Sequence, residues 1–123
     1  MDCSRVQRLA SISFAYGGSQ DGRSATFHPQ HLLAIGDSDK EALRNGMEQL
    51  ADFAEATDTS LERPTIAGAL RSVCDDYPNV IEIYFRVRKL MHENNDCFRE
   101  FYFTIFEMIH TDNGPSIKCV ARY

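Results

Sequence analysis

The stretch that decides the fold is Asn79–Tyr123, NVIEIYFRVRKLMHENNDCFREFYFTIFEMIHTDNGPSIKCVARY. In residues 80–91, and again in residues 98–110, apolar and polar side chains alternate with a period of two. This alternation is typical of a β-strand with one buried face. The polar residues 93–96 between the two runs are typical of a turn. The sequence therefore predicts a β-hairpin formed by these two strands.

The faces of the two strands set the register of this hairpin. Pairing Phe85 with Phe103 keeps the apolar side chains of both strands on the same face. The same register places Arg88 opposite Glu100, which is an attractive cross-strand pair. We therefore expect this register.

A third strand is predicted after Asn113-Gly114, which is a strong hairpin signal. Pro115 has no N–H to donate in a two-residue hairpin loop, so we expect a longer loop with an odd number of residues. Such a loop turns one set of side chains toward the core, namely Ile117, Cys119 and Ala121. It turns the alternate set toward the other face, and a two-residue loop would exchange the two sets.

The N-terminal part of the chain predicts two more strands. Residues 5–16 carry apolar side chains at alternate positions, which favours a strand. Residues 25–35 begin the same alternation, but Pro29 interrupts it. Because proline cannot donate a ladder hydrogen bond, this segment is expected at the edge of a sheet.

Two amphipathic helices are predicted in the middle of the chain. Ser38 with Glu41 three residues later forms a capping box, and an apolar stripe continues to about Ala56. The second helix is expected over about 64–76. Gly68 lies inside it, and we expect this glycine to allow close packing.

These elements predict the fold class. We expect an α+β fold, specifically a two-layer sandwich with a mostly antiparallel sheet, the order ββααβββ, and two helices packed on one face. Residues 1–123 are expected to form a single α+β domain.

Composition limits the class of protein. Of the 123 residues, 43% are hydrophobic and 25% are charged, which is ordinary for a globular domain. The net charge of −5 argues against nucleic acid as a partner, because that binding depends on neutralising phosphates. No stretch approaches the ~20 apolar residues of a membrane helix, and no signal peptide follows Met1. Four widely spaced cysteines favour free thiols and a cytoplasmic protein over two disulfides.

Catalytic and ligand-binding motifs give little support for an enzyme. Gly17-Gly18 lacks the lysine and the spacing of a phosphate-binding loop. His28 and His31 flank Pro29 and have no third metal ligand nearby. Cys97 follows polar residues but has no identifiable base or oxyanion site. We expect no metal and no cofactor, we assign no catalytic residue, and a non-enzymatic protein is favoured.

Two short segments resemble known families. The order strand–strand–helix–helix–strand–strand is similar to the tunnelling fold of pterin and purine enzymes, and Pro64-Thr65 resembles the start of their P-T-x-E motif. In that family the acid anchors the heterocycle, whereas this chain has Ala67 at the matching position. Separately, Gly36-Asp37-Ser38 through Glu41-Ala42 and Asn45 resembles the start of the helix in HicB-type antitoxins. Neither resemblance assigns the chain to a family.

The second face of the C-terminal sheet is the predicted contact surface. Tyrosine and arginine are enriched where interfaces carry binding energy. The residues expected there are Tyr84, Arg86, Arg88, Tyr102, Phe106, Met108, Lys118 and Arg122. The alternative is an ordinary solvent-exposed face with scattered apolar side chains.

We therefore expect a small, acidic interaction or regulatory protein that binds a protein partner or itself, in the manner of an inhibitor or immunity protein. A homodimer is the expected form of self-association, because symmetric dimers are the commonest oligomers. The alternative is a small-molecule-binding protein or enzyme with a tunnelling-fold-like site at a subunit interface. Its polar groups would come from Tyr16, His28, His31, Glu82 or His92.

Overall fold

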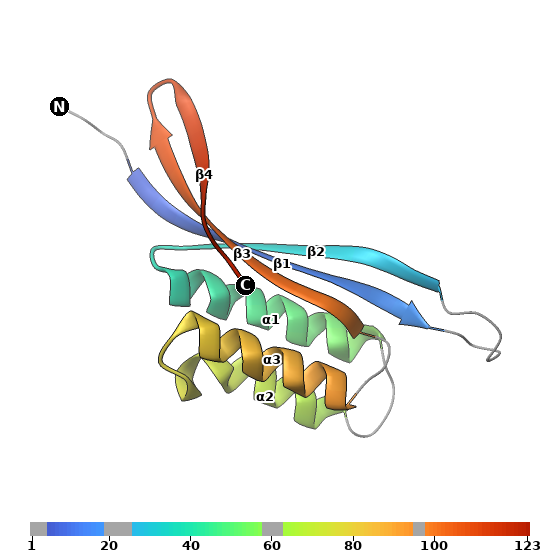
Figure 1. The fold of residues 1–123 in the computed structure, drawn as a ribbon. Coiled ribbons are helices and arrows are strands. Elements are labelled where there is room, and N and C mark those ends of the chain that lie inside the picture. The colour runs from blue at the N-terminus through green and yellow to red at the C-terminus, as the bar shows by residue number, and fades with distance from the viewer. Residues whose placement is uncertain (1–4, 19–25, 58–62, 95–97) are drawn as a thin grey trace.

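The computed structural model describes residues 5–18, 26–57, 63–94 and 98–123 (Figure 1). Seven elements follow one another along the chain: β1 (Arg5–Gly18), β2 (Thr26–Gly36), α1 (Asp39–Thr57), α2 (Arg63–Asp76), α3 (Val80–Asn94), β3 (Phe98–Thr111) and β4 (Gly114–Arg122). The strands form one antiparallel sheet in the order β2-β1-β3-β4. All three helices lie on the same side of the sheet (Figure 1). The predicted fold class, an α+β two-layer sandwich, is confirmed.

The predicted strand over residues 80–91 is wrong, because this segment is helix α3. Its fully buried side chains are four residues apart, at Ile83, Val87 and Met91, which is helical spacing. The predicted hairpin with β3, including the Phe85–Phe103 and Arg88–Glu100 pairs, is therefore also wrong. Within the described residues, the sheet has four strands and the helical layer has three helices.

Helix α3 begins with Asn79 as its N-cap residue. The backbone N–H of Glu82 donates to Oδ1 of Asn79 at 3.0 Å, and Nδ2 of Asn79 donates to Oε1 of Glu82 at 3.2 Å. Helix α1 begins in a related way, since the N–H of Glu41 donates to Oγ of Ser38 at 3.1 Å. These contacts satisfy N–H groups that have no partner within a helix. The capping box predicted at Ser38 is confirmed in its first half.

Strand β3 pairs with β1 and contains a bulge. Phe103 lies opposite Ile12, and the register shifts between Ser13 and Ala15 of β1. At this shift Glu100 has a φ of 58°, in the left-handed region that costs a side-chain-bearing residue roughly 1–2 kcal/mol. The bulge allows Phe98 and Phe101, which are three residues apart, both to be buried.

The turn into β4 contradicts the expected odd-length loop. Thr111 pairs with Gly114, so Asp112 and Asn113 form a two-residue turn, and Gly114 takes a φ of 107°. A second register shift follows, because Ile105 pairs with Ala121 while Phe106 pairs with Cys119. Ala121 therefore packs against the core as expected. Ile117 and Cys119 are exposed, so their predicted place in the core is wrong.

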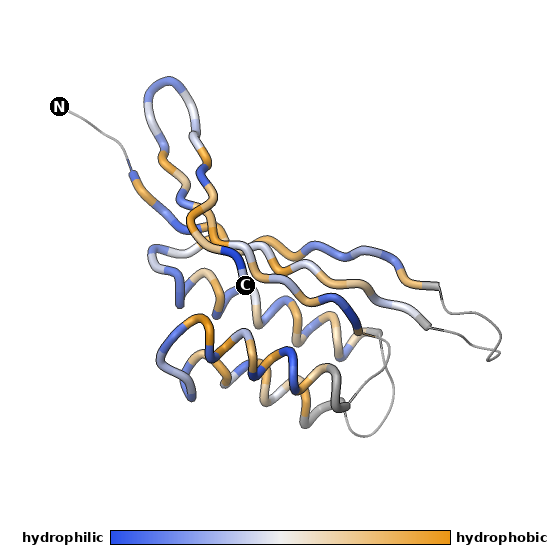
Figure 2. The backbone as a smooth tube through the Cα atoms, in the orientation of Figure 1, coloured by the Kyte–Doolittle hydropathy of each residue, from blue (hydrophilic) through white to orange (hydrophobic). Residues whose placement is uncertain are grey.

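The core lies between the sheet and the helices. From β1 it receives Ala10, Ile12 and Phe14, which are at most 3% exposed. The apolar stripe predicted for α1 is buried, and apolar positions recur along both layers in Figure 2. A Cβ added at Gly46 of α1 would lie 2.6 Å from Cδ1 of Ile12, whereas one at Gly68 would meet nothing within 4 Å. Close packing therefore depends on Gly46, and the expectation for Gly68 is wrong.

An arginine links α2 to α1. The Arg71 guanidinium donates to Glu55 at 2.6 Å, to Asp52 at 2.8 Å and to Glu48 at 3.2 Å. These hydrogen bonds, first of all the one to Glu55, raise the pKa of Arg71. The hydrogen bond from Arg71 lowers the pKa of Glu55. Three carboxylates on one face of α1 are thus matched by one cation from the neighbouring helix.

Candidate functional site

One face of the sheet is not covered by any described element (Figure 1). We call it the open face. In β1 and β2 it consists of the odd-numbered residues 5–15 and 27–35, because the even-numbered residues of β1 point to the helices. Cross-strand pairing adds Arg99 and the even-numbered residues 102–110 of β3. From β4 it adds Pro115, Ile117, Cys119 and Arg122.

Apolar side chains occupy much of the open face. Leu33 and Ile35 of β2 are 56% and 45% exposed, and Ile117 of β4 is 54% exposed. Between these strands, Leu9 of β1 lies opposite both Ile35 and Phe106. The apolar side chains therefore run across all four strands of the sheet. Large exposed apolar areas of this kind usually mark an interaction site.

The charges of the open face are of one sign. No strand position assigned to it carries Asp or Glu, although the chain has 18 acidic residues. Its cations are Arg5, Arg99 and Arg122. Glu100 lies at the bulge, where the alternation of faces is interrupted. The open face is therefore apolar and basic on a protein whose net charge is −5.

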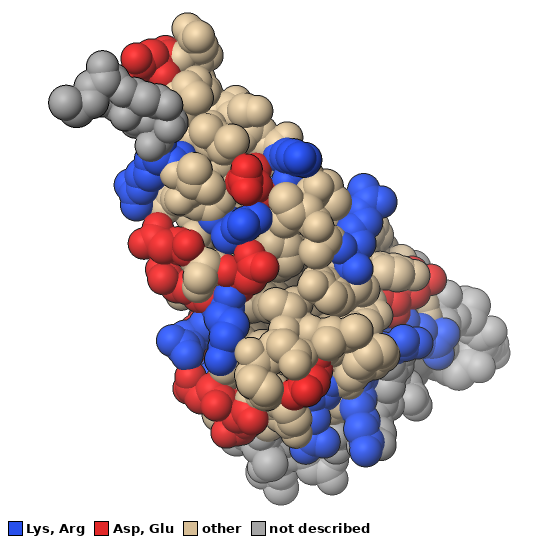
Figure 3. Space-filling model, turned by 60° about the vertical axis from the view of Figure 1, so that its left-hand side comes forward, with Lys and Arg blue, Asp and Glu red and all other residues tan. Residues whose placement is uncertain are grey.

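The arginines differ in whether a carboxylate lies beside them. Those of β1, α1 and the described part of α2 all form ion pairs with Asp or Glu: Arg5, Arg8, Arg44 and Arg71. In the view of Figure 3, acidic and basic side chains lie next to one another around an area of uncharged surface. Those of α3, β3 and β4 form no ion pair with a described residue: Arg86, Arg88, Arg99 and Arg122.

The structure separates the eight residues of the predicted contact surface. Four lie on the open face, namely Tyr102, Phe106, Met108 and Arg122. Three belong to α3 instead, namely Tyr84, Arg86 and Arg88, because residues 80–91 are not a strand. Lys118 lies opposite Glu107 on the helix-facing side of the hairpin. The prediction that all eight share one sheet face is wrong, while a partner-binding role for them stays a prediction.

Tyr84 shows the consequence of the helical conformation. Its side chain is 8% exposed, and its hydroxyl donates to the backbone carbonyl of Phe101 at 3.0 Å. It therefore joins α3 to β3. Phe85, which was expected in the core, is 56% exposed. Met108 is only 7% exposed and adds little accessible surface to the open face.

Both edges of the sheet carry features that oppose pairing with another strand. At β2, the side chains of Gln49 and Asn45 in α1 donate to the backbone carbonyls of Leu33 and Ile35, both at 2.8 Å. The same strand contains Pro29, as expected for an edge strand. At β4, Pro115, Lys118 and the bulge near Cys119 are devices that limit edge-to-edge association. The open face, and not an edge, is therefore the available contact surface of the sheet.

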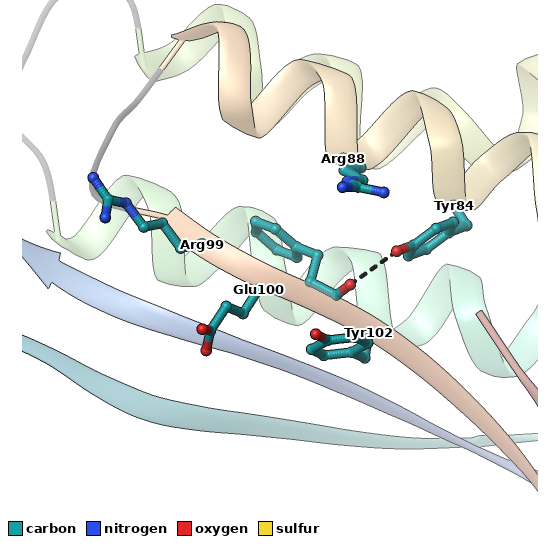
Figure 4. Close-up of a pocket in the computed structure, with 6 residues that line it drawn as sticks. Tyr84, Arg88, Arg99, Glu100 and Tyr102 are labelled. Atoms are coloured by element: carbon teal, nitrogen blue, oxygen red, sulfur yellow. Dashed lines mark hydrogen bonds between the residues drawn. The ribbon is translucent and has the colours of Figure 1, made fainter.

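A cleft of about 550 Å³ lies beside the open face, where α3 approaches β3 (Figure 4). It is lined by Tyr84, Arg88, Arg99, Glu100, Phe101 and Tyr102. The cleft brings together three residues of the predicted contact surface, namely Tyr84, Arg88 and Tyr102. The sequence analysis expected the two segments that carry them to pair as strands, whereas the first of them is helix α3.

The residues considered for catalysis or metal binding are not brought together. His28 and His31 are three apart in β2, so they project to opposite faces of the sheet. Oγ of Ser13 lies 3.0 Å from Nδ1 of His31. No group of three or more potential metal ligands occurs among the described residues. The side chain of His92 lies outside them, as does Cys97.

The described cysteines are free thiols. Cys74 is buried in the core and Cys119 is exposed. Burial raises the pKa of the Cys74 thiol, which makes it a poor nucleophile at neutral pH. Cys3 lies outside the described residues.

The sequence analysis missed the apolar residues of β2. Leu32-Leu33-Ala34-Ile35 is an unbroken apolar run, and in a strand such a run is apolar on both faces. Ala34 faces the helices and is buried, while Leu33 and Ile35 lie on the open face. This run was the available signal for the open face.

Comparison of the chain with family models, with curated proteins and with solved structures finds no match. At the position where the tunnelling-fold motif has its acid, Ala67 is fully buried in the core. Helix α3 also adds a third helix to the order expected for that fold. Among the described helices, none is both long and apolar enough to cross a membrane.

Proposed function

We propose that the protein is a non-enzymatic interaction protein that binds an acidic partner protein through its open face. The observation that carries this proposal is the combination of exposed apolar side chains with cations only. Leu33, Ile35 and Ile117 supply apolar area, and Arg122 and Arg99 supply charge next to it. Partners with complementary charge associate faster and are selected over others.

The charges favour a different protein over a second copy of the chain. Two open faces packed on each other would bring cations of the same sign together, with no carboxylate at the strand positions to compensate them. The homodimer expected from sequence is therefore the second form of this proposal. The aliphatic side chains of β2 also favour protein over nucleic acid, which is bound by stacking on aromatic side chains and by cations along the backbone.

An inhibitory or immunity-type role in the cytoplasm is part of the proposal. It is supported by the small size and the acidic net charge. In such a role the open face would cover a site on the partner, and the helical layer would support the sheet. No reaction is required of the protein.

The test uses two charge reversals on the same strand. Arg122→Glu changes a cation on the open face, and Lys118→Glu changes an exposed cation on the opposite face. Partners are recovered from the native cells by cross-linking to the tagged protein, and binding is then measured with purified components. We expect Arg122→Glu to weaken binding by about tenfold or more and Lys118→Glu to leave it nearly unchanged.

A second variant tests the apolar part of the surface. Leu33→Ser with Ile35→Ser should abolish binding, whereas Val6→Ser, an equally exposed apolar position on the other face of β1, should not. Equal effects of the open-face variants and their controls would refute the proposal. If the wild type has the mass of a dimer in light scattering and the Leu33/Ile35 variant has the mass of a monomer, the open face serves self-association and not an acidic partner. Binding of single-stranded RNA that is lost in Arg122→Glu would replace it with nucleic acid.

A further inference from the structure

The cleft beside the open face exists because β4 is shorter than β3. β4 has 9 residues and β3 has 14. The last backbone contacts between them join Phe103 and Tyr123, whose N–H and C=O groups exchange hydrogen bonds at 3.0 and 2.7 Å. On the N-terminal side of Phe103, no described strand pairs with this edge of β3, and helix α3 lies beside it (Figure 4). The Tyr84 hydroxyl reaches the Phe101 carbonyl there, at the floor of the cleft (Figure 4).

The walls of the cleft carry cations that have no carboxylate partner. Arg88 of α3 is exposed and forms no ion pair with any described residue. Arg99 of β3 also lines the cleft, but its guanidinium carbon lies 4.5 Å from the centre of the Phe27 ring of β2 and points away from Arg88 (Figure 4). Arg88 is therefore the cation that an external group in the cleft would meet. This contrasts with Arg71, whose guanidinium is surrounded by three carboxylates. The cleft therefore offers positive charge to an external group.

An exposed apolar stripe continues from the cleft along α3. Ile81 and Phe85 are 49% and 56% exposed, and they are spaced i and i+4, with Arg88 at i+7. Residues at these spacings lie on the same side of a helix. The stripe from Ile81 to Arg88 spans about 10 Å. The Phe85 ring lies 5.4 Å from the ring of Tyr84, so the stripe and the cleft adjoin.

Glu100 limits which anions the cleft can hold. It lines the cleft, and its φ of 58° lies in a region that favours glycine. A carboxylate at this position repels a second negative charge that enters beside it. A singly charged carboxylate can approach Arg88 on the opposite wall, whereas a phosphate carries close to two charges at neutral pH.

We propose that the cleft and the stripe of α3 form a second contact site, which binds an extended polypeptide segment carrying an apolar residue and a carboxylate. The carboxylate pairs with Arg88, and the apolar residue packs on Phe85 and Ile81. Side chains on the same side of an extended chain are two positions, or about 7 Å, apart. The middle of the Ile81 and Phe85 pair lies about 7.5 Å from Arg88 along the helix, so the two groups are two positions apart. This site is separate from the open face, and its test does not need the partner protein that binds the open face.

The probe is a synthetic peptide of sequence SLLSESSG with blocked ends, in which a leucine and the glutamate are two positions apart and project to the same side of the extended chain. Binding is followed by amide shifts of the isotopically labelled protein. We expect shifts confined to α3 and residues 99–102. Arg88→Ala should weaken binding by about tenfold, while Lys118→Ala, which removes an exposed cation outside the cleft, should not. A second peptide, with glutamine in place of the glutamate, should bind the wild-type protein as weakly as the glutamate peptide binds Arg88→Ala.

A phosphoserine peptide tests the role of Glu100. It should bind more weakly than the glutamate peptide, and Glu100→Gln should narrow or reverse this difference. Shifts that fall elsewhere, an equal effect of Lys118→Ala, or no gain for phosphoserine in Glu100→Gln would overturn the inference. Arg122→Glu should leave peptide binding unchanged, so a failure at the open face and a failure at the cleft give different results.

Discussion

Two glycines in helices provide a matched test of the packing between layers. Replacing glycine by alanine inside a helix gains about 1 kcal/mol of stability from helix propensity. Gly68→Ala should give this full gain, because nothing lies within 4 Å of the new Cβ. At Gly46 the new Cβ would lie 2.6 Å from Cδ1 of Ile12, well inside the optimal carbon–carbon separation of about 3.5–4.0 Å.

The expected sign at Gly46 follows from comparing two effects. Overpacking a core costs about 1–3 kcal/mol, which cancels or exceeds the propensity gain of about 1 kcal/mol. Gly46→Ala should therefore be neutral or destabilising by up to about 2 kcal/mol. Ile12→Val removes the carbon that the new Cβ would meet, at a cost of about 1 kcal/mol. In the Ile12→Val background, Gly46→Ala should become stabilising.

The assay is equilibrium unfolding in urea or guanidinium for the wild type, the three single variants and the Gly46/Ile12 double variant. A difference of 1 kcal/mol corresponds to a shift in melting temperature of about 4 °C for a chain of this size. The reasoning is refuted if Gly46→Ala stabilises as much as Gly68→Ala, because Ile12 would then move aside at no cost. It is also refuted if the Ile12→Val background does not recover the alanine gain.

Three further predictions concern thiols, acid and one hydrogen bond. With a thiol reagent at neutral pH, Cys119→Ser should remove one rapidly reacting thiol and Cys74→Ala should remove none, because Cys74 is buried and its pKa is raised. The lowered pKa of Glu55 stabilises the fold above the ordinary value of 4.5, and this stabilisation is lost as the pH falls through the folded-state pKa. The free energy of unfolding, measured with denaturant, should therefore fall less steeply in Arg71→Met than in the wild type as the pH is lowered from 5. Tyr84→Phe removes the hydrogen bond to the β3 carbonyl and should cost about 1 kcal/mol in the same assay.

The sequence was sufficient to predict the two layers of the fold, but it did not reveal that residues 80–94 form a helix. Val80–Asn94 satisfies two periods at once, since Ile81, Ile83 and Phe85 alternate while Ile83, Val87 and Met91 are four apart. Periodicity cannot decide between the two for a short amphipathic run. The deciding signal was local, because Asn79 and Glu82 have the same spacing as the capping box at Ser38.

The bulges were beyond any pattern in the sequence. Glu100 takes a positive φ, and nothing about a glutamate indicates this conformation. The bulge in β3 follows from the need to bury both Phe98 and Phe101 beside β1, which is a tertiary requirement. The sequence placed Tyr102 and Arg122 on the face of the sheet that is opposite the core, as the structure has them, but it placed Arg88 on a strand although this residue belongs to α3.

The protection of both sheet edges limits how the protein can assemble. Side chains of Asn45 and Gln49 cover one outer strand, and Lys118 with Pro115 disfavours recruitment at the other. Growth along the hydrogen-bonding direction, which leads to fibres, is therefore opposed. A complex can instead add a layer on top of the sheet. Because only one side of the sheet is bare, such stacking ends after a single addition, and the product has a finite size.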